Sequence, residues 1–256
     1  MPAHRSAVWL PGWLVLAAAC TPQAPTRADD PHQPPPATSR CTDVRALDLR
    51  RLLPPPPPDG SPRARAELDE LLRLQRERTP EQVRRAREDV RVGLLRFADA
   101  LGAPAGLDPG RLPLTAALLK EVDVEDTTLI GPAKDAFARA RPFTMEHALE
   151  PVVPRPDTAS YPSGHATWAY TAALVLADLV PERRGALLAR AEEYAHNRNV
   201  GGVHYPSDVQ AGQVAGTVIA AMLFACPAFQ SEEQAAGREL RAVLGLPAAA
   251  ASAATP

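Results

Sequence analysis

The spacing of apolar residues predicts a helical chain from Thr42 onward. Leucines at positions 68, 71, 72 and 74 recur every three or four residues, the spacing of one helix face, and predict a helix over 66–78. The next segment, 79–82, supplies an N-cap threonine, a proline at the first helical position and a capping-box glutamine, so a second long helix is predicted to run to about residue 101. Further helices are predicted over 114–122, 131–140, 165–179, 182–197, 207–225 and 231–244. No segment alternates convincingly as a strand, so the predicted fold is all-α, a compact helical bundle.

Two apolar segments, 166–180 and 211–225, are candidates for membrane spans. Both are shorter than the roughly 20 residues that cross a bilayer, and the first contains Asp178. A buried core helix explains them better than a membrane span does. The domain is therefore expected to be water-soluble.

The first 20 residues are expected to be a secretory signal peptide, because a basic start precedes an apolar stretch over 7–19 and small residues before Cys20. Ala17-Ala18-Ala19-Cys20 resembles a bacterial lipoprotein cleavage site, where the cysteine becomes lipidated, although alanine replaces the usual leucine. The same small residues also suit ordinary signal peptidase, which leaves both routes of export open. The expected location is the periplasm, and a lipid on Cys20 would anchor the protein to the outer membrane.

Residues 21–41 are expected to form a flexible, proline-rich tether, because they offer no apolar face to bury. The folded domain is expected over 42–245, followed by a disordered, alanine-rich tail over 246–256. If Cys20 is lipidated, Cys41 and Cys226 remain. Export permits these two to pair in a disulfide, and two separately buried thiols are the alternative.

The composition excludes some classes of protein. The chain has 256 residues, of which 45% are hydrophobic, and a formal net charge of -2, so disorder throughout and nucleic-acid binding by gross charge are excluded. Only two of the 28 basic residues are lysines, Lys120 and Lys134. Arginine therefore carries the ordinary surface positive charge, and a lysine is considered as a candidate functional residue.

Three clusters of polar residues carry the candidate chemistry. In the first, Lys134 and Arg141 lie seven residues apart, which would place both on one helix face and let them bind one anion. Pro142 would end that helix. A solvated basic face is the alternative, and Arg139 between them is interpreted as generic surface charge.

The second cluster, Ser163-Gly164-His165, lies where a loop enters an apolar helix. Backbone N–H groups at a helix start favour anions, and Gly164 lets a ligand approach the backbone. Ser163 adds a hydroxyl, and His165 offers a proton near neutral pH. A simple helix cap with an incidental histidine explains the same residues.

The third cluster combines a fixed cation, Arg198, with His204 as a nucleophile or base and Asp208 as a carboxylate that can hold the imidazole in one tautomer. Pro206 is predicted to open a helix with Tyr205 extended before it. Asp208 would then lie in the first turn, with His204 just outside it and within reach. A surface loop is the alternative.

Together and in this order, the three clusters resemble the PAP2 phosphatase superfamily. The segments 52–61, 140–143, 160–165 and 226–230 resemble the class A bacterial non-specific acid phosphatases, so the resemblance covers about residues 45–240. Asn197 replaces the serine usual in the family, and Tyr205-Pro206 replaces the Trp-Gln more common in class A. These departures leave the shape of the pocket open.

The resemblance implies a helical acid phosphatase, a phosphoric monoester hydrolase of broad specificity. His204 would form a phosphohistidine, Asp208 would hold its imidazole, and His165 would protonate the leaving alcohol. The implied phosphate-binding residues are Lys134, Arg141, Ser163, Gly164 and Arg198. No cofactor and no metal are expected, and no carboxylate cluster is spaced for Mg²⁺ or Zn²⁺. The expected partner is a small phosphomonoester, with no nucleic-acid scaffold role, and relatives suggest a homo-oligomer.

Three other functions fit parts of the pattern. A vanadium haloperoxidase would bind vanadate through His204, and a membrane lipid phosphate phosphatase would need several true spans. A non-catalytic lipoprotein would bind phosphate without turnover. His147 and His196 are predicted to be structural or surface residues, and the acidic residues within 123–126 are interpreted as a solvated turn.

Overall fold

The computed structural model describes residues 41, 47–103 and 107–248. The chain divides into two units, Met1–Pro35 and Pro36–Pro256, and every described residue belongs to the second. The predictions of a signal peptide over 1–20 and of lipidated Cys20 fall outside the described residues. So do the predicted tether over 21–41, except for Cys41, and the predicted tail over 246–256, except for residues 246–248.

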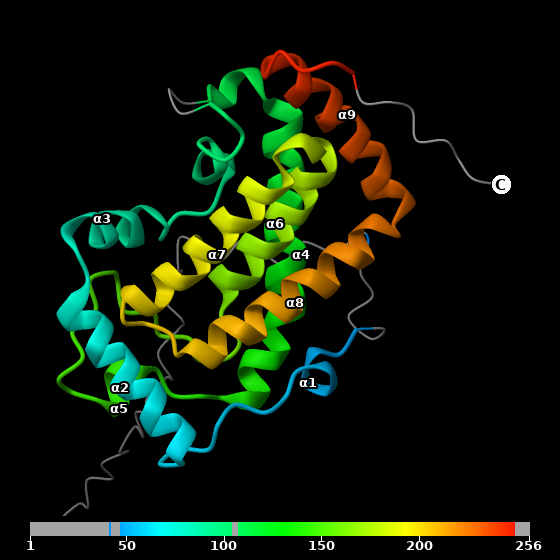
Figure 1. The fold of residues 1–256 in the computed structure, drawn as a ribbon. Coiled ribbons are helices and arrows are strands. Elements are labelled where there is room, and N and C mark those ends of the chain that lie inside the picture. Colours follow the sequence, from blue (N-terminus) through cyan, green and yellow to red (C-terminus); the bar gives the residue numbers. More distant parts are fainter. Residues whose placement is uncertain (1–40, 42–46, 104–106, 249–256) are drawn as a thin grey trace, which may run out of the picture. The chain divides into compact units, whose positions relative to one another are not determined.

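All regular elements in the described part of the chain are helices, which confirms the all-α prediction (Figure 1). The α-helices are α1 (Leu49–Leu52), α2 (Pro62–Glu77), α3 (Pro80–Glu88), α4 (Pro113–Phe137), α5 (Pro142–Met145), α6 (Gly164–Leu179), α7 (Arg184–Val200), α8 (Pro206–Phe224) and α9 (Pro227–Val243). Three short 3-10 helices lie among them: η1 (Leu94–Phe97), η2 (Pro109–Arg111) and η3 (Pro181–Arg183).

Helix α6 is the centre of the main core, with α4, α7 and α8 packed around it (Figure 1). Its residues are buried on nearly every side, and Trp168 lies between the rings of Phe97 and Tyr194. Helix α8 approaches α6 closely because Gly212 has no side chain: a Cβ there would lie 2.6 Å from the carbonyl oxygen of Ser163. This close approach brings the N-termini of α6 and α8 together.

One helix ends much earlier than the sequence predicts. The helix that begins with the expected capping box at Thr79 ends at Glu88, not near residue 101. It ends there because Asp89 turns inward, where its buried carboxylate accepts hydrogen bonds from Arg190 and Asn197. Gly93, at φ +138°, continues the turn in a backbone conformation that suits glycine.

The segments predicted as separate helices over 114–122 and 131–140 are parts of one helix, α4, which passes through Pro132. The residue before a proline resists the helical conformation mainly because its Cβ meets the proline ring, and here that residue is Gly131. Helix α4 ends at Phe137, and Ala138 takes a left-handed conformation at φ +46°. Lys134 and Arg141 therefore do not share a helix face, contrary to the prediction.

The interpretation of residues 123–126 as a solvated acidic turn is wrong. These residues lie within α4, where Glu125 and Asp126 are buried, and Asp126 accepts a hydrogen bond of 2.9 Å from the hydroxyl of Thr171. Within the described ranges, no group of three or more His, Cys, Asp or Glu side chains is placed to hold a metal ion.

Among the residues that the structure describes, no single helix is long and apolar enough to cross a membrane. Helices α8 and α9 reach that length and hydropathy only when taken together, and the chain bends by 94° between them. The segments 166–180 and 211–225, weighed above as spans, form parts of the buried helices α6 and α8.

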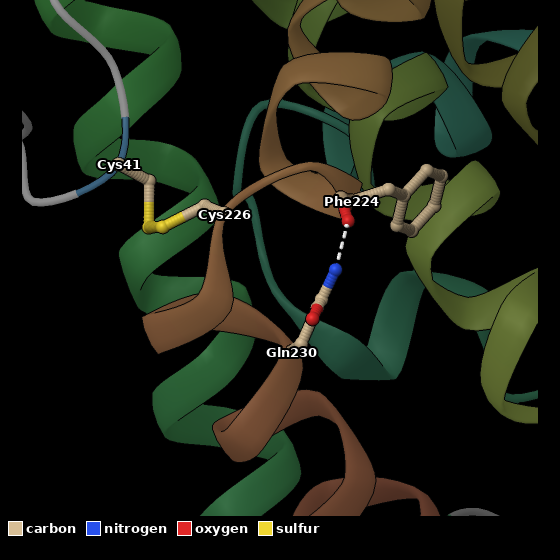
Figure 2. The surroundings of a disulfide bond; sticks show 4 residues. All are labelled: Cys41, Phe224, Cys226 and Gln230. Atoms are coloured by element: carbon tan, nitrogen blue, oxygen red, sulfur yellow. Dashed lines mark hydrogen bonds between the residues drawn. A yellow bond between two sulfur atoms is a disulfide. The ribbon is translucent and has the colours of Figure 1, made fainter. Parts of the chain in front are cut away.

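A disulfide joins Cys41, at the beginning of the described chain, to Cys226, the N-cap residue of α9 (Figure 2). The two Cα atoms lie 5.4 Å apart and 185 residues apart in sequence. Beside it, the side-chain amide of Gln230 donates a hydrogen bond of 2.7 Å to the carbonyl oxygen of Phe224 (Figure 2). The first turn of α9 is thus fixed both to α8 and to the N-terminal segment.

Candidate active site

The three sequence clusters meet where four long helices begin or end (Figure 1). Helix α4 ends just after Lys134 and α7 ends just after Arg198, while α6 begins at Gly164 and α8 begins at Pro206. The backbone N–H of Ser163 donates a hydrogen bond of 3.0 Å to the carbonyl oxygen of Asp208, which ties the second cluster to the third.

His204 connects the first cluster to the third. Its Nε2 lies 2.9 Å from Nη1 of Arg141, and its Nδ1 lies 3.3 Å from Oδ2 of Asp208. Because a guanidinium can only donate, Nε2 accepts the hydrogen bond and Nδ1 carries the proton that faces the carboxylate. This tautomer leaves the Nε2 lone pair as the reactive position of a buried imidazole.

The local backbone of the third cluster agrees with its prediction. Pro206 is the first residue of α8, Tyr205 before it is extended, and Asp208 lies in the first turn. A serine, a backbone N–H and an arginine also hold the Asp208 carboxylate, as described below. Burial raises the pKa of Asp208, and the charge of Arg139 opposes that rise.

Three cations surround His204. Burial and the neighbouring charges of Arg141 and Arg198 lower the pKa of Lys134 to about 7, and burial and Arg198 lower that of Arg141 to about 10. Both side chains line a cavity of about 520 Å³. Crowded, desolvated cations of this kind favour a bound anion, which would relieve their mutual repulsion.

Arg198 is the most isolated of these cations. It is 2% exposed, and its Nε and Nη1 have no hydrogen-bond partner among the described residues. Its positive charge contributes to lowering the pKa of both His165 and His204. A buried guanidinium with free donors is costly unless an anion binds to it.

Ser163 and Gly164 begin α6 as predicted. The Ser163 hydroxyl oxygen accepts a hydrogen bond of 3.3 Å from the backbone N–H of Ala166, so the serine is the N-cap. The hydroxyl hydrogen remains available as a donor. The helix-cap role and a phosphate-binding role are therefore compatible.

The ring of His165 is oriented by two contacts. Its Nε2 lies 3.0 Å from the carbonyl oxygen of Val90, and the ring stacks on Tyr194 with the centroids 6.3 Å apart. Burial and the charge of Arg198 hold its pKa well below the usual range. Because the carbonyl can only accept, Nε2–H donates the hydrogen bond to it, and the other ring nitrogen, Nδ1, is left for a ligand.

Sequence reasoning missed the residues that hold Asp208. Arg139, interpreted above as generic surface charge, is 6% exposed and donates from Nη1 to Oδ1 of Asp208 at 2.6 Å. Ser160 donates to Oδ2 of the same carboxylate, and Glu67 of α2 accepts from Arg139 at 2.8 Å. The sequence feature that could have indicated a role of Arg139 in the site is its position two residues before Arg141. His147 and His196 are exposed, in agreement with their prediction.

Comparison with known proteins agrees with this arrangement. The family profile described as the PAP2 superfamily matches residues 115–232. An acid phosphatase of Zymomonas mobilis subsp. mobilis is 32% identical over 197 residues, which cover 73% of this chain and 74% of that protein. A non-specific acid phosphatase of Salmonella typhimurium is 31% identical over 189 residues, which cover 70% of this chain and 74% of that protein. The structure titled as the first bacterial vanadium-dependent iodoperoxidase superposes with a TM-score of 0.51 at 17% identity, covering 68% of this chain and 51% of that one, and so shares the fold alone.

Proposed function

The chain belongs to the PAP2 superfamily and, within it, to the acid phosphatases, and from this premise we propose that it hydrolyses phosphate monoesters through a phosphohistidine intermediate, without a metal ion. The contact between Nε2 of His204 and Nη1 of Arg141, 2.9 Å long, carries the proposal. It fixes a neutral nucleophile beside a cation that can hold the phosphoryl group.

In the first step, Nε2 of His204 attacks phosphorus in line with the leaving oxygen, and the P–O bond breaks as the N–P bond forms. Burial and the charge of Arg141 hold the pKa of His204 well below its usual range, so Nε2 stays unprotonated in acid solution and keeps the lone pair that attacks phosphorus. The positive charge that develops on the ring is stabilised by Asp208 through Nδ1.

His165 supplies the proton for the leaving alcohol and then takes one from the water that hydrolyses the intermediate. Its low pKa leaves it neutral in the unliganded site. A phosphate among the three cations adds negative charge, which raises the pKa of this ring. The acid form is therefore produced by substrate binding, and low pH favours it.

Charge on the transferred phosphoryl group is balanced by Lys134, Arg141 and Arg198, with Ser163 and the Gly164 N–H as further donors. A divalent cation beside these three cations would be repelled. The lysine is cationic below its pKa of about 7 and loses its charge above it, so phosphate affinity is greatest on the acid side.

Hydrolysis of p-nitrophenyl phosphate at acid pH tests the proposal. We expect EDTA to leave the rate unchanged, because arginine and lysine side chains, rather than a metal ion, balance the charge on the phosphoryl group. Vanadate should inhibit competitively, because it mimics five-coordinate phosphorus. Strong loss of activity on chelation, restored by a divalent metal, would contradict the metal-independent mechanism. Halide oxidation by peroxide and vanadate without phosphatase turnover would favour the haloperoxidase alternative.

We also propose that the chain is exported and that Cys20 carries a lipid anchor. The disulfide between Cys41 and Cys226 supports export, because such bonds persist in oxidising compartments. In a bacterial host we expect the wild-type protein in the membrane fraction and the Cys20→Ser variant in the soluble periplasmic fraction. Mass spectrometry of the mature N-terminus would identify the lipid, and an unmodified N-terminus beyond Cys20 would contradict the anchor.

A further inference from the structure

Arg139 is buried although it occurs in a charged stretch of the sequence. Its side chain is 4% exposed, and its guanidinium carbon lies 3.7 Å from the centre of the Tyr205 ring. The exposed Arg73 and Arg84 pair with carboxylates along their own helices. Arg139 instead pairs with carboxylates 69 and 72 residues away in sequence, so it connects distant parts of the fold.

The guanidinium of Arg139 divides between two buried carboxylates. Nη1 donates to Oδ1 of Asp208 at 2.6 Å and to the hydroxyl of Ser207 at 2.8 Å, while Nη2 donates to Oε2 of Glu67 at 2.8 Å. Glu67 is itself fixed by the N-terminus of α8, because its Oε1 accepts from the backbone N–H of Ser207 at 3.1 Å. Helix α2 is thereby joined to the first turn of α8.

This arrangement assigns different donors to the two oxygens of Asp208. Arg139 holds Oδ1, and Oδ2 faces the Ser160 hydroxyl, the backbone N–H of Tyr205 and Nδ1 of His204. The carboxylate therefore cannot rotate without breaking a charged hydrogen bond. Its orientation toward the imidazole is set from the side opposite the ring.

The negative charge of Asp208 also requires Arg139 as a partner. Asp208 and Glu67 are both at least nine-tenths buried. Glu67 has a second cation in the exposed Arg63, whose Nε lies 3.9 Å from its Oε1, whereas Arg139 is buried and contacts both carboxylates. Without Arg139, Asp208 would lose its arginine partner in a desolvated site, and a protonated Asp208 would be a weaker acceptor for Nδ1–H of His204.

We propose that Arg139 is a positioning residue that keeps Asp208 ionised and oriented toward His204, and that Glu67 holds Arg139 in place for this task. This inference rests on the proposed role of His204 as the nucleophile. It adds to the site an arginine and a glutamate that act through Asp208.

The test is the pH profile of the Arg139→Met variant, whose side chain keeps much of the volume and loses the charge. We expect kcat at acid pH to fall about 100-fold, with KM changed by less than about threefold, because ground-state phosphate contacts remain. Without the cation the pKa of Asp208 rises, so the acidic limb of the kcat profile moves to higher pH and part of the lost rate returns there. The other ionisable groups around Asp208 are His204, Lys134, Arg141, Glu67, Tyr161 and Tyr205.

A double-mutant cycle separates positioning from general stability. In an Asp208→Asn background, Arg139→Met should lower kcat by less than about threefold, because the carboxylate it serves is already gone. Arg190→Met is the matched control, since Arg190 is also buried and paired with a buried carboxylate, Asp89. This control can lower the midpoint of thermal unfolding but should leave the acidic limb in place.

Glu67→Gln provides a second variant should Arg139→Met fail to fold. It keeps the shape and hydrogen-bonding capacity, and it should lower kcat less than Arg139→Met does, with little change in KM. Additive losses in the cycle, or an acidic limb that does not move while kcat stays near wild type, would overturn the positioning role. Those results are distinct from failure of the proposed function, which would appear as a His204→Ala enzyme that still turns over.

Discussion

Replacing His204 by alanine should abolish phosphatase activity, with kcat for p-nitrophenyl phosphate reduced by about four orders of magnitude, as for other covalent nucleophiles. The reason is local: Nε2 of this ring faces Arg141 at 2.9 Å, and no other histidine in the described site has both a cation at one nitrogen and a carboxylate at the other. Steady-state kinetics at acid pH measure the loss.

The control for this experiment is His147→Ala. His147 is exposed and lies outside the three clusters, so its replacement should leave kcat within about twofold of wild type, as surface changes usually do. Thermal unfolding should show that both variants fold. A His204→Ala enzyme with more than about a tenth of wild-type kcat would exclude this residue as the nucleophile.

His165→Ala should have the second largest effect, and the size of that effect should depend on the leaving group. For an alkyl phosphate, whose alcohol must be protonated as it leaves, we expect kcat/KM to fall by about 10³-fold, within the usual range for a general acid. For p-nitrophenyl phosphate, whose nitrophenolate leaves without a proton, the fall in kcat/KM should be at least about tenfold smaller. Comparison of the two substrates on wild type and variant measures the difference.

Equal losses on both substrates would contradict the role of His165 as the acid. They would instead indicate that the ring only shapes the site, through its contacts with Val90 and Tyr194. Tyr194→Phe is a suitable control, because it keeps the stacked ring and removes only a hydroxyl that donates to the Arg91 carbonyl at 3.2 Å. It should show no dependence on the leaving group.

The helical fold was predictable because its signals are local. The capping box at Thr79, the proline that opens α8 and the leucine periodicity of α2 each act within a turn or two of helix. The end of α3 was not predictable in this way. It depends on the buried carboxylate of Asp89, whose partners Arg190 and Asn197 lie more than 100 residues later.

The site residues that belong to a family motif were predictable from the sequence. Those whose burial depends on partners far away in sequence were not. The sequence placed Lys134 and Arg141 together by assuming a shared helix, and the structure brings both beside His204 although α4 ends at Phe137. Arg139 was dismissed because charge on an arginine-rich chain is usually solvated. Its burial depends on Glu67, which belongs to a helix far away in sequence.

The central claim is that phosphate is transferred to His204, and trapping the intermediate tests it most directly. His165→Ala enzyme mixed with p-nitrophenyl phosphate should form the phosphohistidine and hydrolyse it slowly, because the base that activates water is missing. Quenching in alkali, which preserves the N–P bond, followed by mass spectrometry of the peptides should then locate one phosphoryl group on His204. Burst release of nitrophenol with no phosphoryl group on His204, or with the group on another residue, would contradict the account.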